Sequence, residues 1–305
     1  MRALIFGGTQ FVGRHIAEEA ERRGHALTLV HRGKTNPGLF PQAEHVALDR
    51  LENVDALQGR AFDAVIDVSA YVPRAVRLAR EALADQFGRY LFISTISVYD
   101  LAAMGAITHP DESAPLLELE DPTTEIINAE TYGGLKVLCE RELADLGDRL
   151  TIVRPGIVVG QYDHTNRFHH WTREILTRDQ VAVPPRQDQP SQWIDGADLA
   201  RLTWDLVEQG VAGAFNACGP ETAETLGSML NGIAAATGRH PEWIPADAEE
   251  LPKMRFLLPE DGSADAMFRV SNAKAISAGL RFRPFAETVA DVAAEIRAEP
   301  PQTSN

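Results

Sequence analysis

Tyr132 and Lys136 are the residues of this sequence whose types and spacing best suit proton chemistry. A separation of four residues places both side chains on one face of a helix, one turn apart. A neighbouring ammonium group stabilises a phenolate, so the pair predicts a tyrosine whose pKa falls from about 10 toward neutrality. Such a phenol exchanges a proton with a substrate oxygen at working pH, and the lysine can also reach a ribose hydroxyl.

Three hydroxyl side chains precede this helix in the sequence. Ser94, Thr95 and Ser97 follow the apolar run 90–93, which has the composition of a buried strand. Ligands of open α/β sheets bind at the carboxyl ends of the strands. We therefore expect this group of hydroxyls to lie at the ligand-binding edge of a sheet.

A glycine-rich turn at residues 6–13 joins the first predicted strand to the first predicted helix. Gly7 permits a sharp turn, and Gly13 lets the helix pack closely on the strand, so that the helix N-terminus faces a pyrophosphate. A second strand ends near His31, at the distance that a dinucleotide-binding βαβ unit requires. The turn predicts a dinucleotide site, with a purely structural turn as the alternative. The other residues of the turn expected to contact the cofactor are Thr9, Gln10, Phe11 and Val12.

The end of the second predicted strand distinguishes between two cofactors. An acidic residue there would bind the adenosine ribose of NAD, whereas this sequence has three potential cations, His31, Arg32 and Lys34. Positive charge suits the 2′-phosphate of NADP, so NADP is predicted, with NAD as the alternative and an exposed basic loop as a third interpretation. The ends of the next two strands supply further candidate cofactor contacts, with loop capping as their alternative role: Asp49, Arg50, Val68 and Ser69.

Short apolar runs alternate with helical patterns along the first half of the chain. The predicted strands are 4–6, 27–30, 46–48, 64–66, 90–93 and 150–153, and the helices between them include 14–23, 73–83 and 132–146. This alternation predicts an α/β Rossmann fold with a doubly wound parallel sheet. We expect residues 1–160 and about 193–220 to form the dinucleotide-binding domain. A smaller C-terminal substrate-binding lobe is expected from residues 161–192 and 221–305.

The polar stretch 161–170 contains candidate ligands for a substrate. Asn166 and Arg167 could bind a polar or anionic group of a small molecule. His164, His169 and His170 lie in the same stretch, but adjacent histidines rarely converge and no paired carboxylate completes a site, so no metal is expected.

Composition limits the classes of partner. The 305 residues carry 29 basic and 44 acidic side chains, a formal charge of −15, which repels nucleic acid but leaves room for a small anionic cofactor. Cys139 and Cys218 are far apart, which predicts neither a disulfide framework nor a zinc site. Since no secretory leader and no membrane-spanning apolar run is evident, we expect no membrane association and a cytoplasmic location.

Five motifs together make residues 1–198 resemble the extended short-chain dehydrogenase/reductases. They are the glycine-rich turn, Ser94 to Tyr99, Tyr132 with Lys136, Arg154-Pro155-Gly156, and Trp193 to Leu199. The resemblance implies hydride transfer to or from the nicotinamide C4, with Tyr132 as acid or base. It matches Thr95 to the catalytic Ser/Thr of the family, with Ser97 as the reserve candidate and a substrate contact. It also implies a homodimer packed through helices, although monomers occur.

Three departures from the family pattern modify these expectations. Gln10 replaces the middle glycine of the turn, where it would either crowd the pyrophosphate or donate a hydrogen bond to it. Ile96 and Ser97 stand where sugar-nucleotide dehydratases carry Asp and Glu, which disfavours dehydration. The acid-rich segment 100–131 predicts an active-site flap that would disfavour a nucleotide-diphosphate substrate.

The turn and the basic strand end are most similar to an atypical, epimerase/dehydratase-like branch in which reductase-like members stand beside chloroplast RNA-associated proteins. The leading hypothesis is therefore an NADP-dependent oxidoreductase acting on a carbonyl or alcohol of a small polar molecule, sugar-like compounds included. The alternatives are an NAD-retaining sugar epimerase and a nucleotide-sensing binding protein without catalytic activity.

Overall fold

A seven-stranded parallel sheet forms the centre of the computed structural model, which describes residues 1–105, 107–247, 249, 251, 254 and 256–299. Its strand order is β10-β6-β5-β4-β1-β2-β3. The strands are β1 (Arg2–Phe6), β2 (Ala26–His31), β3 (Glu44–Ala47), β4 (Phe62–Asp67), β5 (Phe87–Ile93), β6 (Leu150–Pro155) and β10 (Gly213–Ala217). After β3 the chain crosses to the other side of β1 and continues with β4, so the strand order reverses there. This reversal opens a crevice at the carboxyl edge of the sheet beside β1. The predicted Rossmann fold is confirmed.

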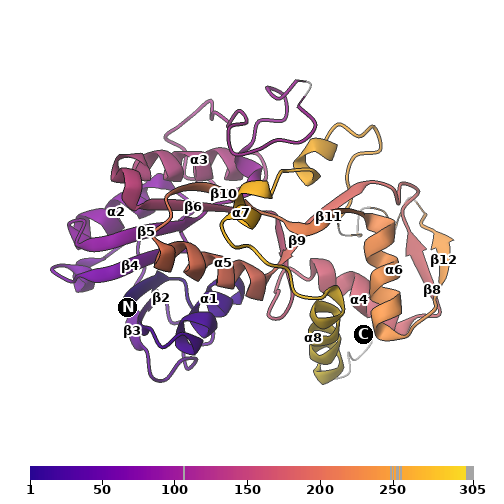
Figure 1. Cartoon of the computed structure of the whole chain (residues 1–305), viewed down its shortest axis with the longest axis horizontal. Coiled ribbons are helices and arrows are strands. Elements are labelled where there is room, and N and C mark those ends of the chain that lie inside the picture. Colours follow the sequence, from indigo (N-terminus) through magenta and orange to yellow (C-terminus); the bar gives the residue numbers. More distant parts are fainter. Residues whose placement is uncertain (106, 248, 250, 252–253, 255, 300–305) are drawn as a thin grey trace.

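Helices cover both faces of this sheet (Figure 1). One face carries α1 (Phe11–Arg22) and α5 (Gly196–Gln209), and the other carries α2 (Pro73–Leu83) and α3 (Tyr132–Leu143). Neighbouring residues of β1 belong to different cores, because successive side chains of a strand point to opposite faces: Ile5 packs under α1 and Leu4 under α2. Burial on both faces explains why these strands are continuous apolar runs.

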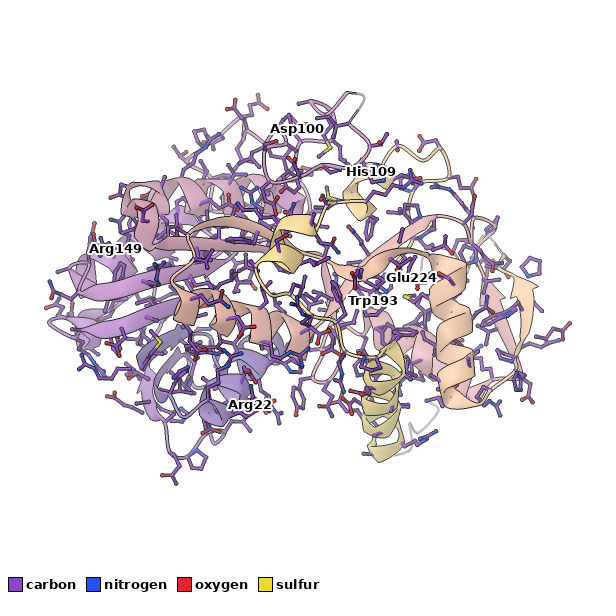
Figure 2. The ribbon with its side chains drawn as sticks, viewed as in Figure 1. Arg22, Asp100, His109, Arg149, Trp193 and Glu224 are labelled. Atoms are coloured by element: carbon purple, nitrogen blue, oxygen red, sulfur yellow. The ribbon has the colours of Figure 1, made fainter. Side chains whose placement is uncertain are left out.

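A smaller lobe adjoins the end of the sheet, on the right in Figure 1. It packs around its own core, in which Trp193 lies next to the sheet-bearing part (Figure 2). Its elements are β7 (Ile157–Val159), α4 (Arg167–Thr177), β8 (Gln180–Val183), β9 (Pro190–Asp195), β11 (Gly219–Thr225), α6 (Leu226–Thr237), β12 (Glu242–Pro245) and α8 (Phe285–Ala298). The helix α7 (Ala273–Ser277) differs from the expected division of the chain. Its Ala275 joins the core beneath α1 and α5, although residues 221–305 were all expected in the lobe.

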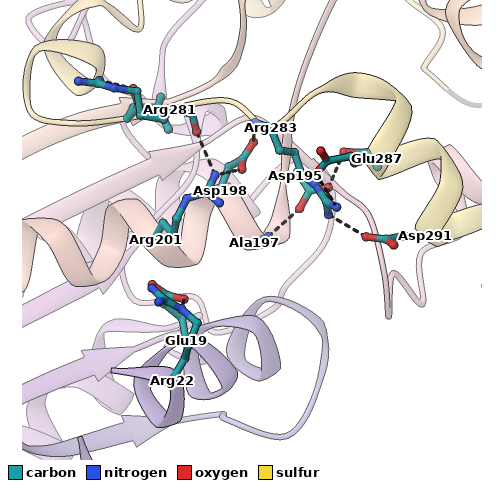
Figure 3. A network of polar contacts seen from close by, with 12 residues as sticks. Glu19, Arg22, Asp195, Ala197, Asp198, Arg201, Arg281, Arg283, Glu287 and Asp291 are labelled. Atoms are coloured by element: carbon teal, nitrogen blue, oxygen red, sulfur yellow. Dashed lines mark hydrogen bonds and ion pairs between the residues drawn. The ribbon is translucent and has the colours of Figure 1, made fainter. Parts of the chain in front are cut away.

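A buried carboxylate connects the lobe to the sheet at the start of α5 (Figure 3). Asp195 caps α5 by accepting the backbone N–H of Ala197 at 2.7 Å, and it also accepts the hydroxyl of Thr288 on α8 at 2.6 Å. Arg283 reaches both Asp195, at 3.4 Å, and Asp291 on α8, at 2.8 Å. One carboxylate therefore caps the N-terminus of a helix that covers the sheet and also holds the last helix of the lobe.

The connection 100–131, which contains Asp100 and His109 (Figure 2), runs from the end of β5 to α3. It is anchored near its middle, where the Glu112 carboxylate accepts the backbone N–H of Asn216 on β10 at 2.8 Å. Short 3₁₀ turns complete the description: η1 (Asp55–Leu57), η2 (Ile96–Val98), η3 (Ala144–Arg149) and η5 (Asp265–Phe268). None of the helices that the structure describes is long and apolar enough to cross a membrane.

We predict that Asp195→Ala lowers the free energy of unfolding by about 2 to 4 kcal/mol, because it removes a helix cap and leaves the buried Thr288 hydroxyl without its acceptor. Thr225→Ala is the matched control, since Thr225 caps α6 in a more exposed place. That change should cost about 1 kcal/mol. Urea denaturation measures both values, and equal losses would show that the link to α8 contributes nothing.

Candidate active site

The glycine-rich turn joins β1 to α1, and steric contact fixes its shape. Gly7 has φ +92°, and a Cβ on it would lie 3.0 Å from the Cβ of Ser69. A Cβ on Gly13 would lie only 1.7 Å from the carbonyl oxygen of Gly7. Gln10 occupies the N-cap position of α1 and makes no side-chain cap hydrogen bond. The N-terminal end of α1 thus keeps free backbone N–H groups, the usual partner of a phosphate.

A cavity of about 880 Å³ lies along the carboxyl edge of the sheet and begins at this turn. Every residue predicted to bind cofactor or substrate, or to catalyse, lines it except Gly13 and Asn166. Gly13 acts inside the turn, and Asn166 is the N-cap residue of α4 next to the lining residue Arg167. The predicted residues in the wall are Gly7, Thr9, Gln10, Phe11, Val12, His31, Arg32, Lys34, Asp49, Arg50, Val68, Ser69, Thr95, Ser97, Tyr132, Lys136 and Arg167.

The basic strand end lies at one end of this cavity, but only two of its three potential cations can supply charge. The Nδ1 of His31 faces the backbone N–H of Gly33 at 3.0 Å, and its Nε2 faces Nδ1 of His45 at 2.8 Å. Burial and the neighbouring His45 lower the pKa of His31. The expectation that His31 is a cation is therefore wrong at neutral pH, and Arg32 and Lys34 carry the charge.

Arg50 is buried in the cavity wall and is neutralised there. Its guanidinium donates to both carboxylate oxygens of Asp67, at 2.6 and 2.8 Å, and Asp67 also accepts the hydroxyl of Tyr90 at 2.6 Å. Burial would raise the pKa of Asp67, but the Arg50 guanidinium outweighs it and holds that pKa below the usual value. Arg50 therefore shapes the wall as half of an ion pair, while Asp49 remains in the lining and accepts the backbone N–H of Leu51 at 3.0 Å.

Tyr132 and Thr95 meet in the wall of the same cavity. A hydrogen bond with Thr95 lowers the pKa of Tyr132, but burial and the neighbouring Tyr71 act more strongly and raise it to about 12. The prediction of a lowered tyrosine pKa is therefore wrong for this structure. Its physical reason is that desolvation of the phenolate dominates, and Lys136 is not among the main groups acting on Tyr132.

The ammonium group of Lys136 is buried between two backbone carbonyl groups. Its ammonium group donates to the carbonyl oxygens of Ala70, at 2.9 Å, and Ile93, at 2.7 Å. It also lies 4.1 Å from the centre of the Phe92 ring. Burial lowers the pKa of Lys136 to about 8, so the group is still mostly protonated at neutral pH.

The segment 100–131 contributes to the cavity differently from what its acids suggested. Of its described residues, only Ile127 lines the cavity. Two of its carboxylates instead pair with surface arginines: Glu125 with Arg74 at 2.6 Å and Glu118 with Arg141 at 3.4 Å. The inference that an acidic flap disfavours a nucleotide-diphosphate substrate therefore loses its basis.

Several lining residues were not predicted as site residues, and four of them add rings or a thioether to the wall. Tyr71 follows β4, and its ring centre lies 6.2 Å from that of Tyr132. Its position just after a strand end could have identified it, because that edge carries the site. His164 also lines the cavity, packed edge-on against Phe11 at 6.1 Å between ring centres. The other two, which come from η5 of the C-terminal segment and have no sequence motif, are Met267 and Phe268.

Charges in the wall contrast with those of the whole chain. Of the charged side chains that line the cavity in the described structure, five are basic and only Asp49 is acidic. The basic ones are Arg32, Lys34, Lys136, Arg167 and Arg50, of which Arg50 is neutralised by Asp67. This local excess of positive charge suits an anionic ligand despite the formal charge of −15. Within the described residues, no cluster of three or more His, Cys, Asp or Glu could hold a metal ion.

The model of the NAD dependent epimerase/dehydratase family matches residues 3–218. A relative, the chloroplast stem-loop binding protein of 41 kDa b of Arabidopsis thaliana, is 26% identical over 270 residues, 82% of this chain and 67% of the relative.

Solved structures share the fold, among them the following two. The UDP-glucose 4-epimerase of Thermus thermophilus in complex with NAD has a TM-score of 0.70 and 18% identity, over 98% of this chain and 99% of that one. A human epimerase family protein with NADPH has a TM-score of 0.68 and 18% identity, over 96% of this chain and 99% of that one. With the match over residues 3–218, the chain belongs to the NAD dependent epimerase/dehydratase family, enzymes of the extended short-chain dehydrogenase/reductase type.

Proposed function

We propose that this protein is an NADP-dependent oxidoreductase that transfers a hydride to or from a carbonyl or alcohol of a small polar molecule, sugar-like compounds included. One observation carries the proposal. A single cavity runs from a phosphate-binding turn to Tyr132 and Thr95, and the end of β2 contributes Arg32 and Lys34 to its wall. A nicotinamide cofactor is supported by the family, and the choice of NADP rests on these two cations.

The residues present fit a dinucleotide. Because Gly13 has no side chain, it can lie against the carbonyl group of Gly7, and α1 begins close to the end of β1, where its backbone N–H groups would meet a phosphate. Arg32 and Lys34 are exposed at the mouth of the same cavity and would bind a 2′-phosphate. Asp49, Val68 and Ser69 would border the adenine and the riboses, and Lys136 has a third N–H to offer a ribose hydroxyl.

The protein's own residues would then handle one proton. The bound nicotinamide would supply or accept the hydride. Thr95, with Ser97 beside it at 3.2 Å between hydroxyl oxygens, would hold the substrate oxygen near Tyr132. Because its pKa is about 12, Tyr132 carries its proton at neutral pH and suits the role of general acid, the direction of carbonyl reduction. Arg167, with Asn166 behind it, would bind a polar or anionic group of the substrate.

An NAD-retaining sugar epimerase is the second candidate, and one of the structures that share the fold is a UDP-glucose 4-epimerase bound to NAD. The same Tyr132 and Thr95 would serve that reaction. The two functions differ in cofactor use, because an epimerase restores its cofactor in each cycle and consumes no added NADPH, whereas a reductase oxidises it in proportion to product.

A binding role without catalysis is the third candidate. The Arabidopsis relative is named as a stem-loop binding protein, yet the formal charge of −15 on this chain opposes binding to a polyanion. The basic residues of the cavity wall instead line a space of small-molecule size. A homodimer and a cytoplasmic location stay predictions.

Arg32→Ala should weaken NADPH binding by about 10- to 100-fold and leave NADH binding nearly unchanged, because a charged hydrogen bond to the 2′-phosphate is lost. Fluorescence titration of the pure protein with both nucleotides measures this. Arg22→Ala, on the far end of α1, is the control that should bind both nucleotides like the wild type. Tighter binding of NADH by the wild type would overturn the choice of NADP.

Tyr132→Phe should lower kcat by about 10²- to 10⁴-fold with little change in the affinity for NADPH, because only the proton donor is removed. The assay follows NADPH oxidation with a panel of small carbonyl compounds. Tyr162→Phe, a tyrosine packed under Arg14 and outside the cavity lining, serves as the control. Unchanged turnover in the Tyr132 variant would contradict both enzymatic functions.

Lys136 should make stability depend on pH in a defined direction. Its pKa in the folded state, about 8, lies below the unfolded value of about 10.4, so the buried charge costs stability below pH 8 and this cost fades between pH 8 and 10.4. From pH 7.5 to pH 10 the wild type should therefore gain about 2 kcal/mol over Lys136→Met in denaturant unfolding. Lys274→Met, at an exposed site, keeps Lys136, so the difference in unfolding free energy between the wild type and this variant should not change with pH. A constant difference between the wild type and Lys136→Met would mean that Lys136 is not desolvated.

A further inference from the structure

Two histidines on neighbouring strands meet beside the basic end of the cavity. His31 ends β2 and lines the cavity, whereas His45 lies in β3 and does not. Their rings meet edge to face with 5.1 Å between centres. The Nε2 of His31 and the Nδ1 of His45 are 2.8 Å apart, which is hydrogen-bond distance.

The partners of the two rings determine where each proton resides. The Gly33 backbone N–H can only donate, so Nδ1 of His31, 3.0 Å away, must accept and lack a hydrogen. The proton of His31 is then on Nε2, which donates to Nδ1 of His45. The Nε2–H of His45 in turn donates to the carbonyl oxygen of Phe40 at 3.1 Å. The result is a one-way chain of three hydrogen bonds through two neutral imidazoles.

These three hydrogen bonds hold two separate parts of one loop. We define the basic loop as residues 32–43, between β2 and β3, which contains Arg32 and Lys34. Its beginning is fixed by the bond from Gly33 to His31, at a residue with φ +69°. Its far part is fixed at Phe40, whose side chain is buried in the core and whose carbonyl accepts from His45.

A third contact ties the basic loop to the phosphate-binding turn. The side-chain amide of Asn36 donates to the carbonyl oxygen of Thr9 at 3.2 Å. The loop therefore has one fixed point between its two exposed cations, at Gly33, and two after them, at Asn36 and Phe40. Because lysine and arginine side chains are flexible, their selectivity for a phosphate depends on where the backbone places them.

We propose that His45 is a positioning residue for cofactor choice: by accepting a hydrogen bond from the Nε2–H of His31, it fixes the Gly33 turn and with it the place of Arg32 opposite the 2′-phosphate of the cofactor. This inference rests on the proposed NADP preference. His45 acts through His31 and the loop backbone and touches no cofactor itself. His45 therefore affects only the contacts of the protein with the 2′-phosphate. NADH has no 2′-phosphate, so NADH binding does not depend on His45.

Two substitutions separate positioning from simple packing. His45→Leu keeps a similar volume but removes both the acceptor for His31 and the donor to Phe40. His45→Asn keeps an acceptor near the Nδ1 position, since an asparagine amide oxygen can accept a hydrogen bond. Titrations use NADPH and NADH, and the fragments 2′,5′-ADP and 5′-AMP. Arg32→Ala is the positive control, because it removes the charge directly.

The expected result is that His45→Leu weakens NADPH and 2′,5′-ADP binding about tenfold, with NADH and 5′-AMP binding within about twofold of the wild type, and that His45→Asn restores most of the loss. Unchanged NADPH binding in His45→Leu overturns the inference. Equal weakening of all four ligands also overturns it, because the effect would then be on the fold.

A measurement without cofactor tests the hydrogen-bond chain and distinguishes the two proposals. Two-bond ¹⁵N–¹H spectra of the wild type should show His31 protonated on Nε2 and not on Nδ1, and His45→Leu should disturb that pattern. Failure of the proposed function would instead appear in the wild type and in Arg32→Ala, as a preference for NADH that Arg32 does not affect. A His31 protonated on Nδ1 would contradict the inference whichever nucleotide is preferred.

Discussion

The contact between Gly13 and Gly7 is the steric constraint on which the site depends. A side chain at Gly13 would begin 1.7 Å from a backbone oxygen, so no residue but glycine allows α1 to start where it does. The left-handed conformation of Gly7, at φ +92°, turns the chain out of β1 and beside Ser69, which follows β4. Together these contacts place the start of α1 at the crevice where the strand order reverses.

Buried charge forms much of the wall beyond this turn. Arg50 and Asp67 neutralise each other, while the ammonium group of Lys136 depends on two carbonyl oxygens and the face of Phe92. Desolvating an ammonium group is unfavourable for folding, as the lowered pKa of Lys136 indicates. A group retained in spite of that cost is more consistent with a role at the site than with stability.

The charge inside the cavity is opposite in sign to the net charge of the chain. An overall formal charge of −15 coexists with a cavity whose charged wall is mostly basic. Acids of the connection 100–131 are part of the reason, because Glu118 and Glu125 pair with surface arginines instead of facing the cavity. Net charge thus opposes binding to a polyanion but says nothing about a small anionic ligand.

The sequence by itself determined the sheet, the glycine-rich turn and the gathering of the strand-end hydroxyls at one edge, and its resemblance to a family placed Thr95 beside Tyr132. Strands buried on both faces are continuous apolar runs, and residues at the carboxyl ends of parallel strands meet at one edge, so linear order predicts these neighbours. The protonation states of Tyr132 and His31 were decided only by the tertiary structure, as was the contribution of Met267 and Phe268 to the cavity. Desolvation and hydrogen bonding depend on which groups distant in sequence pack around a side chain, and spacing along the chain does not contain that information.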